Sequence, residues 1–178
     1  LCGELGGMGY EALCSYEPYY EEYRSLIGRL GEDRYSVYAE ALLFAADRVL
    51  HYARVVGPAL RRGAVVVLDR YYHSSIAYQG ARGAPPDWVR SLNRFAPPPD
   101  LAIYLDVDPE TGLRRKLGDS WDKERFQRAE LLGRVREIYL GLVEEGELLL
   151  VDASRSLGEV YGDVLSLVLG FLAGRRGG

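Results

Sequence analysis

Short apolar segments alternate with amphipathic ones along this chain. The clearest apolar segment is Val65, Val66, Val67 and Leu68, which runs without a polar interruption and is mostly β-branched. Such a run is typical of a strand buried on both faces of a parallel sheet. Further strands are expected at residues 12–16, 101–105 and 148–151.

Helical periodicity fills the intervals between these strands. Apolar residues recur at spacings of three and four in residues 19–30, 35–60, 87–95, 109–117 and 125–144, and a last helix should end near residue 172. Asp87, Asp108 and the capping box of Ser156 and Glu159 are expected to start three of these helices. Pro58 should kink or end the long helix. The alternation predicts a single α/β domain over residues 1–178, a doubly wound parallel sheet flanked by helices.

Composition narrows the class of protein without identifying it. Apolar residues make up 48% of the chain and charged residues 27%, which excludes a disordered protein. The net charge of −4 argues against general nucleic-acid binding, and no apolar run approaches the ~20 residues of a membrane span. Cys2 and Cys14 lack the spacing of metal ligands, so we expect reduced thiols in a cytoplasmic protein.

The candidate functional residues follow the end of the strand at residues 65–68. Asp69 and Arg70 follow it directly, and ligands of open α/β sheets bind beyond the carboxyl ends of the strands. Arginine pairs bidentately with phosphate oxygens, so a phosphorylated ligand is favoured over a purely structural Asp–Arg pair. Further polar residues should face the same crevice from the start of the next helix: Ser74, Ser75, Tyr78 and Gln79.

Several sequence blocks, in this order and spacing, resemble the thymidylate kinase family. They are Leu43-Phe44-Ala45-Ala46-Asp47-Arg48, Asp69-Arg70-Tyr71 with Ser74-Ser75 and Ala77-Tyr78-Gln79-Gly80, Leu92-Asn93-Arg94-Phe95-Ala96, Pro99-Asp100-Leu101 with Tyr104-Leu105-Asp106-Val107-Asp108-Pro109, and Asp152-Ala153-Ser154. The resemblance spans nearly the whole chain. It implies a P-loop nucleoside monophosphate kinase-like fold with a short lid at about residues 114–128.

The resemblance implies an acceptor site for dTMP. Phe44 would stack on thymine, Arg48 would donate to a base carbonyl, and Arg70 would hold the nucleotide's phosphate. Ser75 would meet the base edge and Tyr78 the sugar, with Glu17, Pro18, Ser74 and Gln79 as further substrate-binding residues. The residues alone leave plainer alternatives: Phe44 in the core, Arg48 on the surface and Ser74 as a helix N-cap.

The resemblance also implies a donor site for ATP and Mg²⁺. Arg114 and Arg125 would close on ATP from the lid, whereas Arg115 is equally consistent with ordinary surface charge. Asp152 and Ser154 would lie near adenine. Asp69 would position Mg²⁺ through water or orient the acceptor phosphate. His51 and His73 are not expected to be catalytic, and the family suggests a homodimer through the long helices.

Two departures from the family pattern affect the expected activity. Tyr16 stands before Glu17-Pro18, where the family commonly has an arginine. No Gly-x-x-x-x-Gly-Lys-[Ser/Thr] motif occurs in the sequence, so we expect ~20–30 upstream residues to carry that loop and its strand. Two hypotheses follow: a kinase that phosphorylates dTMP, or a non-catalytic nucleotide-binding homologue. A kinase for another nucleoside or nucleotide is disfavoured by Phe44, Arg48 and the block from Asp69 to Gln79.

Overall fold

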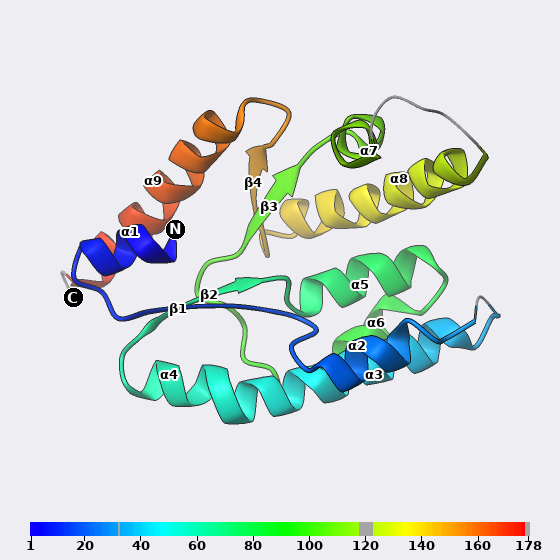
Figure 1. Ribbon diagram of the computed structural model, residues 1–178, viewed down its shortest axis with the longest axis horizontal. Helices are drawn as coiled ribbons and strands as arrows, with labels where there is room; N and C mark the ends of the chain where they lie inside the picture. The colour runs from blue at the N-terminus through cyan, green and yellow to red at the C-terminus, as the bar shows by residue number, and fades with distance from the viewer. Residues whose placement is uncertain (32, 118–122, 177–178) are drawn as a thin grey trace. The chain divides into compact units, whose positions relative to one another are not determined.

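The computed structural model describes residues 1–31, 33–117 and 123–176. It divides into two compact units, Leu1–Pro97 and Pro98–Gly178, and each is described here by itself. Both units combine helices with parallel strands, which confirms the mixed α/β class (Figure 1). The expectation of a single domain stays a prediction.

The first unit holds one parallel strand pair and most of the helices. Its elements are α1 (Cys2–Gly7), β1 (Ala12–Tyr16), α2 (Glu21–Ile27), α3 (Ser36–His51), a π-helical turn η1 (Tyr52–Val56), α4 (Gly57–Arg61), β2 (Val65–Asp69), α5 (Tyr72–Ala81) and α6 (Pro86–Leu92). β1 and β2 are parallel, with Ala12 opposite Val65 and Tyr16 opposite Asp69. The polar residues that follow both strands therefore come out at one edge.

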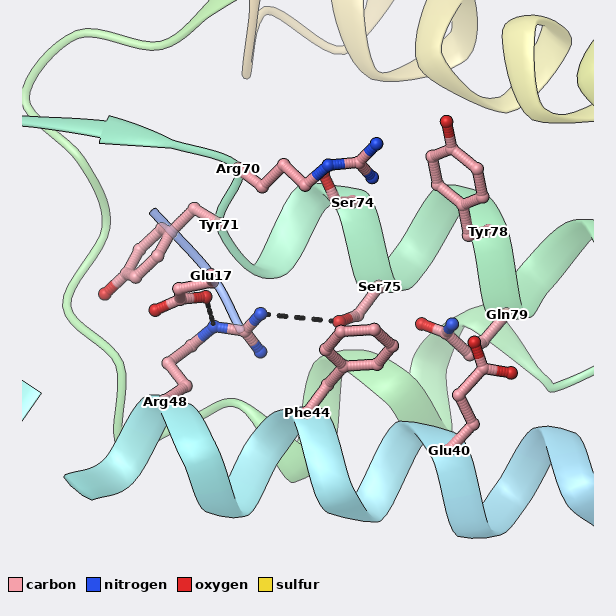
Figure 2. A pocket seen from close by; sticks show the side chains of 10 residues that line it. All are labelled: Glu17, Glu40, Phe44, Arg48, Arg70, Tyr71, Ser74, Ser75, Tyr78 and Gln79. Carbon is pink, nitrogen blue, oxygen red and sulfur yellow. Dashed lines mark hydrogen bonds and ion pairs between the residues drawn. The ribbon is translucent and has the colours of Figure 1, made fainter. Parts of the chain in front are cut away.

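The packing of α3 against α5 positions the site. Ala41 and Ala45 on α3 and Ile76 and Ala77 on α5 are all buried. The α3 and α5 side chains that line the pocket face each other beside this contact (Figure 2).

The long helix continues past Pro58 to Arg61, and a π-helical turn precedes the proline. α3 passes into the π-helical turn Tyr52–Val56 and then into α4, where Pro58 is in the first turn. Proline cannot donate a backbone hydrogen bond, and the turn before it accommodates that loss. Gly63, with φ of +83°, then allows the chain to turn back into β2.

The second unit is built in the same way around another strand pair. Its elements are β3 (Ile103–Asp106), α7 (Pro109–Leu117), α8 (Lys123–Glu144), β4 (Leu149–Asp152) and α9 (Leu157–Arg176). β3 and β4 are parallel, with Asp106 opposite Asp152. The predicted caps form here: Asp108 accepts from the backbone N–H of Glu110 at 2.8 Å, and Ser156 and Glu159 bond reciprocally.

One expectation about the cysteines is wrong. Cys2 and Cys14 form a disulfide, which ties α1 to β1. A separation of 12 residues says nothing about proximity. The chain reverses through residues 8–11, which brings the helix back beside the strand.

The predicted cap at Asp87 is wrong, and the N-cap alternative for Ser74 is not seen either. α5 begins after Tyr71 and α6 after Pro85, so Ser74 and Asp87 lie inside the first turns and cap neither helix. The N–H of Ser74 donates instead to the carbonyl of Tyr71 at 2.9 Å. Each helix therefore starts earlier than its polar residue suggested.

The strands are less buried than their composition predicts. Residues of β2 are half-buried rather than buried on both faces, since β2 pairs with β1 alone in the described part of the chain. One described helix, Leu157–Arg175, meets the length and composition of a membrane span, with a mean hydropathy of 1.4. A single such helix is weak evidence of a membrane span, because signal sequences and core helices of soluble proteins meet the same criterion.

Candidate functional site

A pocket in the first unit brings together most of the residues singled out from the sequence. Its cavity volume is about 80 Å³. Its lining is Glu17, Glu40, Phe44, Arg48, Arg70, Tyr71, Ser74, Ser75, Tyr78 and Gln79. Figure 2 shows α3 presenting one group of these side chains and α5 facing it with another.

Three side chains, spaced about one helical turn apart, form the α3 side of the pocket. Glu40, Phe44 and Arg48 follow each other at four-residue intervals, so they share one face of α3 (Figure 2). An acid, an aromatic ring and a base therefore stand in line along the pocket. Sequence reasoning found Phe44 and Arg48 but missed Glu40, although the same four-residue spacing points to it.

Arg48 is buried and held by hydrogen bonds on three sides. Its side chain is almost fully enclosed, with 1% of the residue exposed. Nε donates to Glu17 Oε2 at 2.7 Å, Nη1 to Asn93 Oδ1 at 2.5 Å and Nη2 to Ser75 Oγ at 3.4 Å. A guanidinium has five N–H donors, so two N–H groups of Arg48 have no partner among the described residues. Arg48 is therefore not a surface charge, and its orientation is fixed.

The partners of Arg48 are themselves anchored. Asn93 donates through Nδ2 to the carbonyl of Val89 at 2.8 Å, which leaves Oδ1 directed at Arg48. Glu17 Oε1 lies 3.4 Å from His51 Nδ1, and His51 Nε2 lies 2.8 Å from Ser15 Oγ. His51 is completely buried. The histidine thus belongs to a polar network behind the pocket, a role that nothing in the sequence indicated.

The segment after β1 is fixed by a second buried carboxylate. Asp47 accepts the backbone N–H groups of Tyr19 and Tyr20, both at 2.8 Å. These bonds hold the chain just beyond Glu17-Pro18, whose peptide bond is cis. Glu17 lines the pocket, whereas Pro18 does not.

Arg70 and Tyr71 enter the pocket from the end of β2. Arg70 has φ of +70°, a left-handed conformation that is uncommon outside glycine and clusters at functional sites. Its guanidinium carbon lies 5.0 Å from the centre of the Tyr78 ring. Tyr71 donates its hydroxyl to the carbonyl of Pro97 at 3.1 Å, and burial raises the pKa of that hydroxyl. Tyr71 thereby forms a fixed wall that the sequence did not single out.

The α5 side contributes Ser74, Ser75, Tyr78 and Gln79, and Gln79 stands apart from the others. Only 1% of Gln79 is exposed. Its Oε1 has no hydrogen-bond partner among the residues that the structure describes. Buried polar atoms are rarely left in this state.

Asp69 lies outside this pocket. It lines a second, shallower pocket with Cys14, Ser15, Tyr16 and Val67, and its side chain is exposed. Its backbone carbonyl accepts from the N–H of Glu17 at 3.1 Å, so the ends of β1 and β2 are joined at this point. The Asp69 carboxylate is therefore free of the Arg48 network and open to a ligand or hydrated ion.

The predicted donor-site residues belong to the second unit. Arg114, Asp152 and Ser154 are exposed there, and Arg125 is in the first turn of α8 with a side chain outside the described residues. Residues 118–122 of the predicted lid also lie outside them. Hydrogen bonds from the Ser154 hydroxyl and backbone N–H hold the pKa of Asp152 below its ordinary value.

Arg115 has a defined position rather than the ordinary surface role left open by its sequence. Its guanidinium donates to the carbonyl of Ala153 at 2.6 Å and to that of Ser154 at 2.5 Å. Arg115 thus fixes the loop after β4 to α7. The loop that was expected near adenine is held by a side chain next to the predicted lid residue Arg114.

Comparison with known proteins gives one consistent result. The family model described as thymidylate kinase matches residues 2–164. A probable thymidylate kinase of Staphylothermus marinus is 44% identical over 161 residues, which cover 90% of this chain and 81% of that protein. A probable thymidylate kinase of Thermococcus onnurineus is 41% identical over 90% of this chain and 83% of that protein. A probable thymidylate kinase of Pyrobaculum calidifontis is 44% identical over 78% of this chain and 72% of that protein.

Proposed function

Because this chain belongs to the thymidylate kinase family, we propose that it transfers the γ-phosphoryl group of ATP to dTMP, giving dTDP and ADP. The observation that carries the proposal is the convergence of Phe44, Arg48 and Arg70 on one pocket. An aromatic ring, an oriented donor and a second cation are the groups that a nucleoside monophosphate requires. The family fold, a P-loop nucleoside monophosphate kinase, is part of this proposal.

The acceptor nucleotide would lie along the row on α3. Thymine stacks on Phe44, and the two remaining N–H groups of Arg48 donate to the C4 carbonyl. Tyr78 and Ser74 meet the sugar side, and Arg70 holds the 5′-phosphate by charge-assisted hydrogen bonds. The base thus lies at Phe44 and Arg48, and the phosphate lies at Arg70 after the end of β2.

Phosphoryl transfer needs positioning and charge stabilisation more than covalent chemistry. Arg70 and Asp69 orient the acceptor phosphate, while Arg114 and Arg125 neutralise charge that develops on the transferred group. Mg²⁺, when bound, would offset negative charge on the ATP phosphates. The exposed Asp69 carboxylate fits that ion, because Mg²⁺ keeps several waters and needs only one or two protein carboxylates.

The second candidate is a non-catalytic nucleotide-binding homologue of the family. It is favoured by one observation, the lack of a Gly-x-x-x-x-Gly-Lys-[Ser/Thr] motif within these residues. Such a protein would keep the acceptor pocket and bind dTMP without turnover. The two candidates therefore differ in ADP release and agree in dTMP binding.

The test is an ADP-release assay with the full native chain, ATP, Mg²⁺ and dTMP, beside calorimetry with dTMP alone. Turnover that depends on dTMP supports the kinase, and binding without turnover supports the second candidate. Arg70→Ala should weaken dTMP binding about 10- to 100-fold, because it removes charge-assisted bonds worth roughly 1.5–3 kcal/mol. Arg62→Ala is the matched control, since Arg62 pairs with Glu11 on the exposed surface. No dTMP binding would exclude both candidates.

Selectivity among pyrimidines follows from the same pocket. A methyl group separates thymine from uracil by only ~1–3 kcal/mol, whereas cytosine would leave polar groups unpaired and lose roughly 10⁴ in rate. The expected order of kcat/KM is dTMP, then dUMP, then dCMP. Equal use of dUMP and dCMP would contradict the assignment of Arg48 to the C4 carbonyl.

We also propose that the protein is a cytoplasmic homodimer. Exposed apolar side chains follow one stripe of α3, namely Tyr38, Leu42 and Val49. A second copy of the chain would bury such a stripe. Analytical ultracentrifugation of the wild type and of Leu42→Glu tests this: the wild type should sediment as a dimer and the variant as a monomer.

A further inference from the structure

We infer that His51 is a positioning residue of the acceptor site, which holds Glu17 and, through Glu17, the guanidinium of Arg48. This inference rests on the proposed function and adds a residue that does not itself contact the nucleotide. His51 is completely buried and is not among the residues that line the pocket. It ends α3 three residues after Arg48, so both side chains leave one face of the helix and meet Glu17 there.

The two polar contacts of His51 define where its ring carries a hydrogen. Glu17 Oε2 forms an ion pair with Arg48 Nε at 2.7 Å, and an ionised carboxylate can only accept hydrogen bonds. His51 Nδ1, 3.4 Å from Glu17 Oε1, must therefore donate. One carboxylate cannot compensate two buried cations, which favours the neutral ring with Nε2 as an acceptor. Ser15 Oγ, 2.8 Å from Nε2, then donates to it and selects this tautomer.

The plane of the His51 ring is fixed as well. The Tyr19 ring stacks on it, with centroids 4.4 Å apart and planes inclined by 10°. The backbone N–H of Tyr19 donates to the buried carboxylate of Asp47 at 2.8 Å, so the stacking partner is itself anchored. A ring held by one stacked face and two polar contacts presents its Nδ1–H to Glu17 in one direction.

Both carboxylate oxygens of Glu17 are engaged by side chains of α3. Oε1 meets His51, and Oε2 accepts from Arg48. Without the Nδ1–H contact the carboxylate can rotate about its last bond, and the acceptor that orients Arg48 Nε rotates with it. The N–H groups of Arg48 that are proposed to bind the base then lose their fixed direction. The loss should appear in dTMP binding, because His51 acts through Arg48 and Arg48 is assigned to the base alone.

Two matched amide variants separate the two contacts of His51. An asparagine amide takes about the place of Nδ1, and a glutamine amide takes about the place of Nε2. His51→Asn thus retains a donor for Glu17, whereas His51→Gln retains only the contact with Ser15. By calorimetry on the full native chain, His51→Gln should bind dTMP about 10-fold more weakly, and His51→Asn should stay within about threefold of the wild type.

These variants distinguish positioning from a general structural role. Equal Kd values for the two variants, or weaker binding by His51→Asn, would overturn the inference. In the ADP-release assay the loss in His51→Gln should lie in the KM for dTMP, with kcat and the KM for ATP within about threefold of the wild type. An equal loss in kcat or for ATP would overturn the inference too. Failure of the wild type to bind dTMP would overturn the proposed function instead.

The tautomer of the wild-type ring gives a readout that needs no folded variant. ¹⁵N NMR of the full native chain, labelled at histidine, should show His51 with a protonated Nδ1 and an unprotonated Nε2. Loss of the signal in His51→Asn, or its distinction from His73 in a His73→Asn protein, identifies the residue. A ring protonated at Nε2, alone or together with Nδ1, would overturn the inference.

Discussion

Arg48 shows how a single buried charge organises the pocket. Only 1% of Arg48 is exposed, and its ion-pair partner Glu17 is 5% exposed. Removing one partner of a buried pair leaves the other charge without compensation, which is far costlier than losing an exposed pair. The Tyr71 ring, 5.6 Å from the Arg48 guanidinium, adds a favourable aromatic face.

Arg48→Met should therefore destabilise the protein by about 3–5 kcal/mol, measured by urea unfolding. The exposed pair of Arg62 and Glu11 supplies the control, and Arg62→Met should cost less than about 1 kcal/mol. The double variant Glu17→Gln, Arg48→Met should be less destabilised than Arg48→Met alone, because the stranded carboxylate is gone. A double variant that is no more stable than Arg48→Met would refute this explanation.

Asn93 is predicted to act through Arg48 rather than on the nucleotide. Its Oδ1 accepts from Arg48 while its Nδ2 is held by the carbonyl of Val89. Asn93→Leu should raise the KM for dTMP about 10-fold while kcat stays within about threefold, because one fixed donor of Arg48 becomes free to turn. Steady-state kinetics check this split. Equal losses in kcat and KM, or a loss for ATP as well, would indicate a general structural defect.

The sequence predicted the helices, strands and caps that a local residue pattern determines. The strands ending at Tyr16, Asp69, Asp106 and Asp152 were found from their apolar runs, and the cap at Ser156 from its box with Glu159. The predicted cap at Asp87 was wrong, because α6 begins after Pro85, and α5 begins after Tyr71 and not at Ser74. Asn93 and the Cys2–Cys14 bond were out of reach, since both depend on elements that meet only after folding.

The contact between β3 and α8 predicts an acid-sensitive second unit. Arg136 donates two hydrogen bonds to Asp106, both of 2.8 Å, and these bonds hold the pKa of Asp106 below its ordinary value of 3.8. A lowered carboxyl pKa stabilises the fold above the ordinary value, and this stability is lost as the pH falls through the folded value.

Arg136→Gln should consequently unfold at higher pH than the wild type in an acid titration followed by circular dichroism. The difference in stability between the two proteins should shrink as the pH falls from 6 towards the folded pKa, because protonated Asp106 no longer benefits from Arg136. Arg134→Gln, which removes an exposed pair with Glu130 on the same helix, is the control and should resemble the wild type. A difference that stays constant with pH would contradict this assignment.

The disulfide should stabilise the first unit by restricting its unfolded chain. A bridge that spans 12 residues contributes about 2–3 kcal/mol in the chain-entropy account. Reducing agent should thus lower the melting temperature by about 5–10 °C. The double variant Cys2→Ser, Cys14→Ser should melt with the reduced wild type and be insensitive to reductant. Identical melting of oxidised and reduced wild type would contradict the prediction.

At the scale of the whole molecule, the two units carry different parts of the proposed reaction. The first unit holds the acceptor pocket, and the second holds Arg114, Asp152 and Ser154, the residues predicted for the donor.

A crystal structure of the full native chain with dTMP tests the proposed acceptor site most directly. We predict that thymine stacks on Phe44 with its C4 carbonyl at Arg48, and that the phosphate contacts Arg70 at the end of β2. A nucleotide bound elsewhere while this pocket stays empty, or a base turned so that its C4 carbonyl faces away from Arg48, would contradict it.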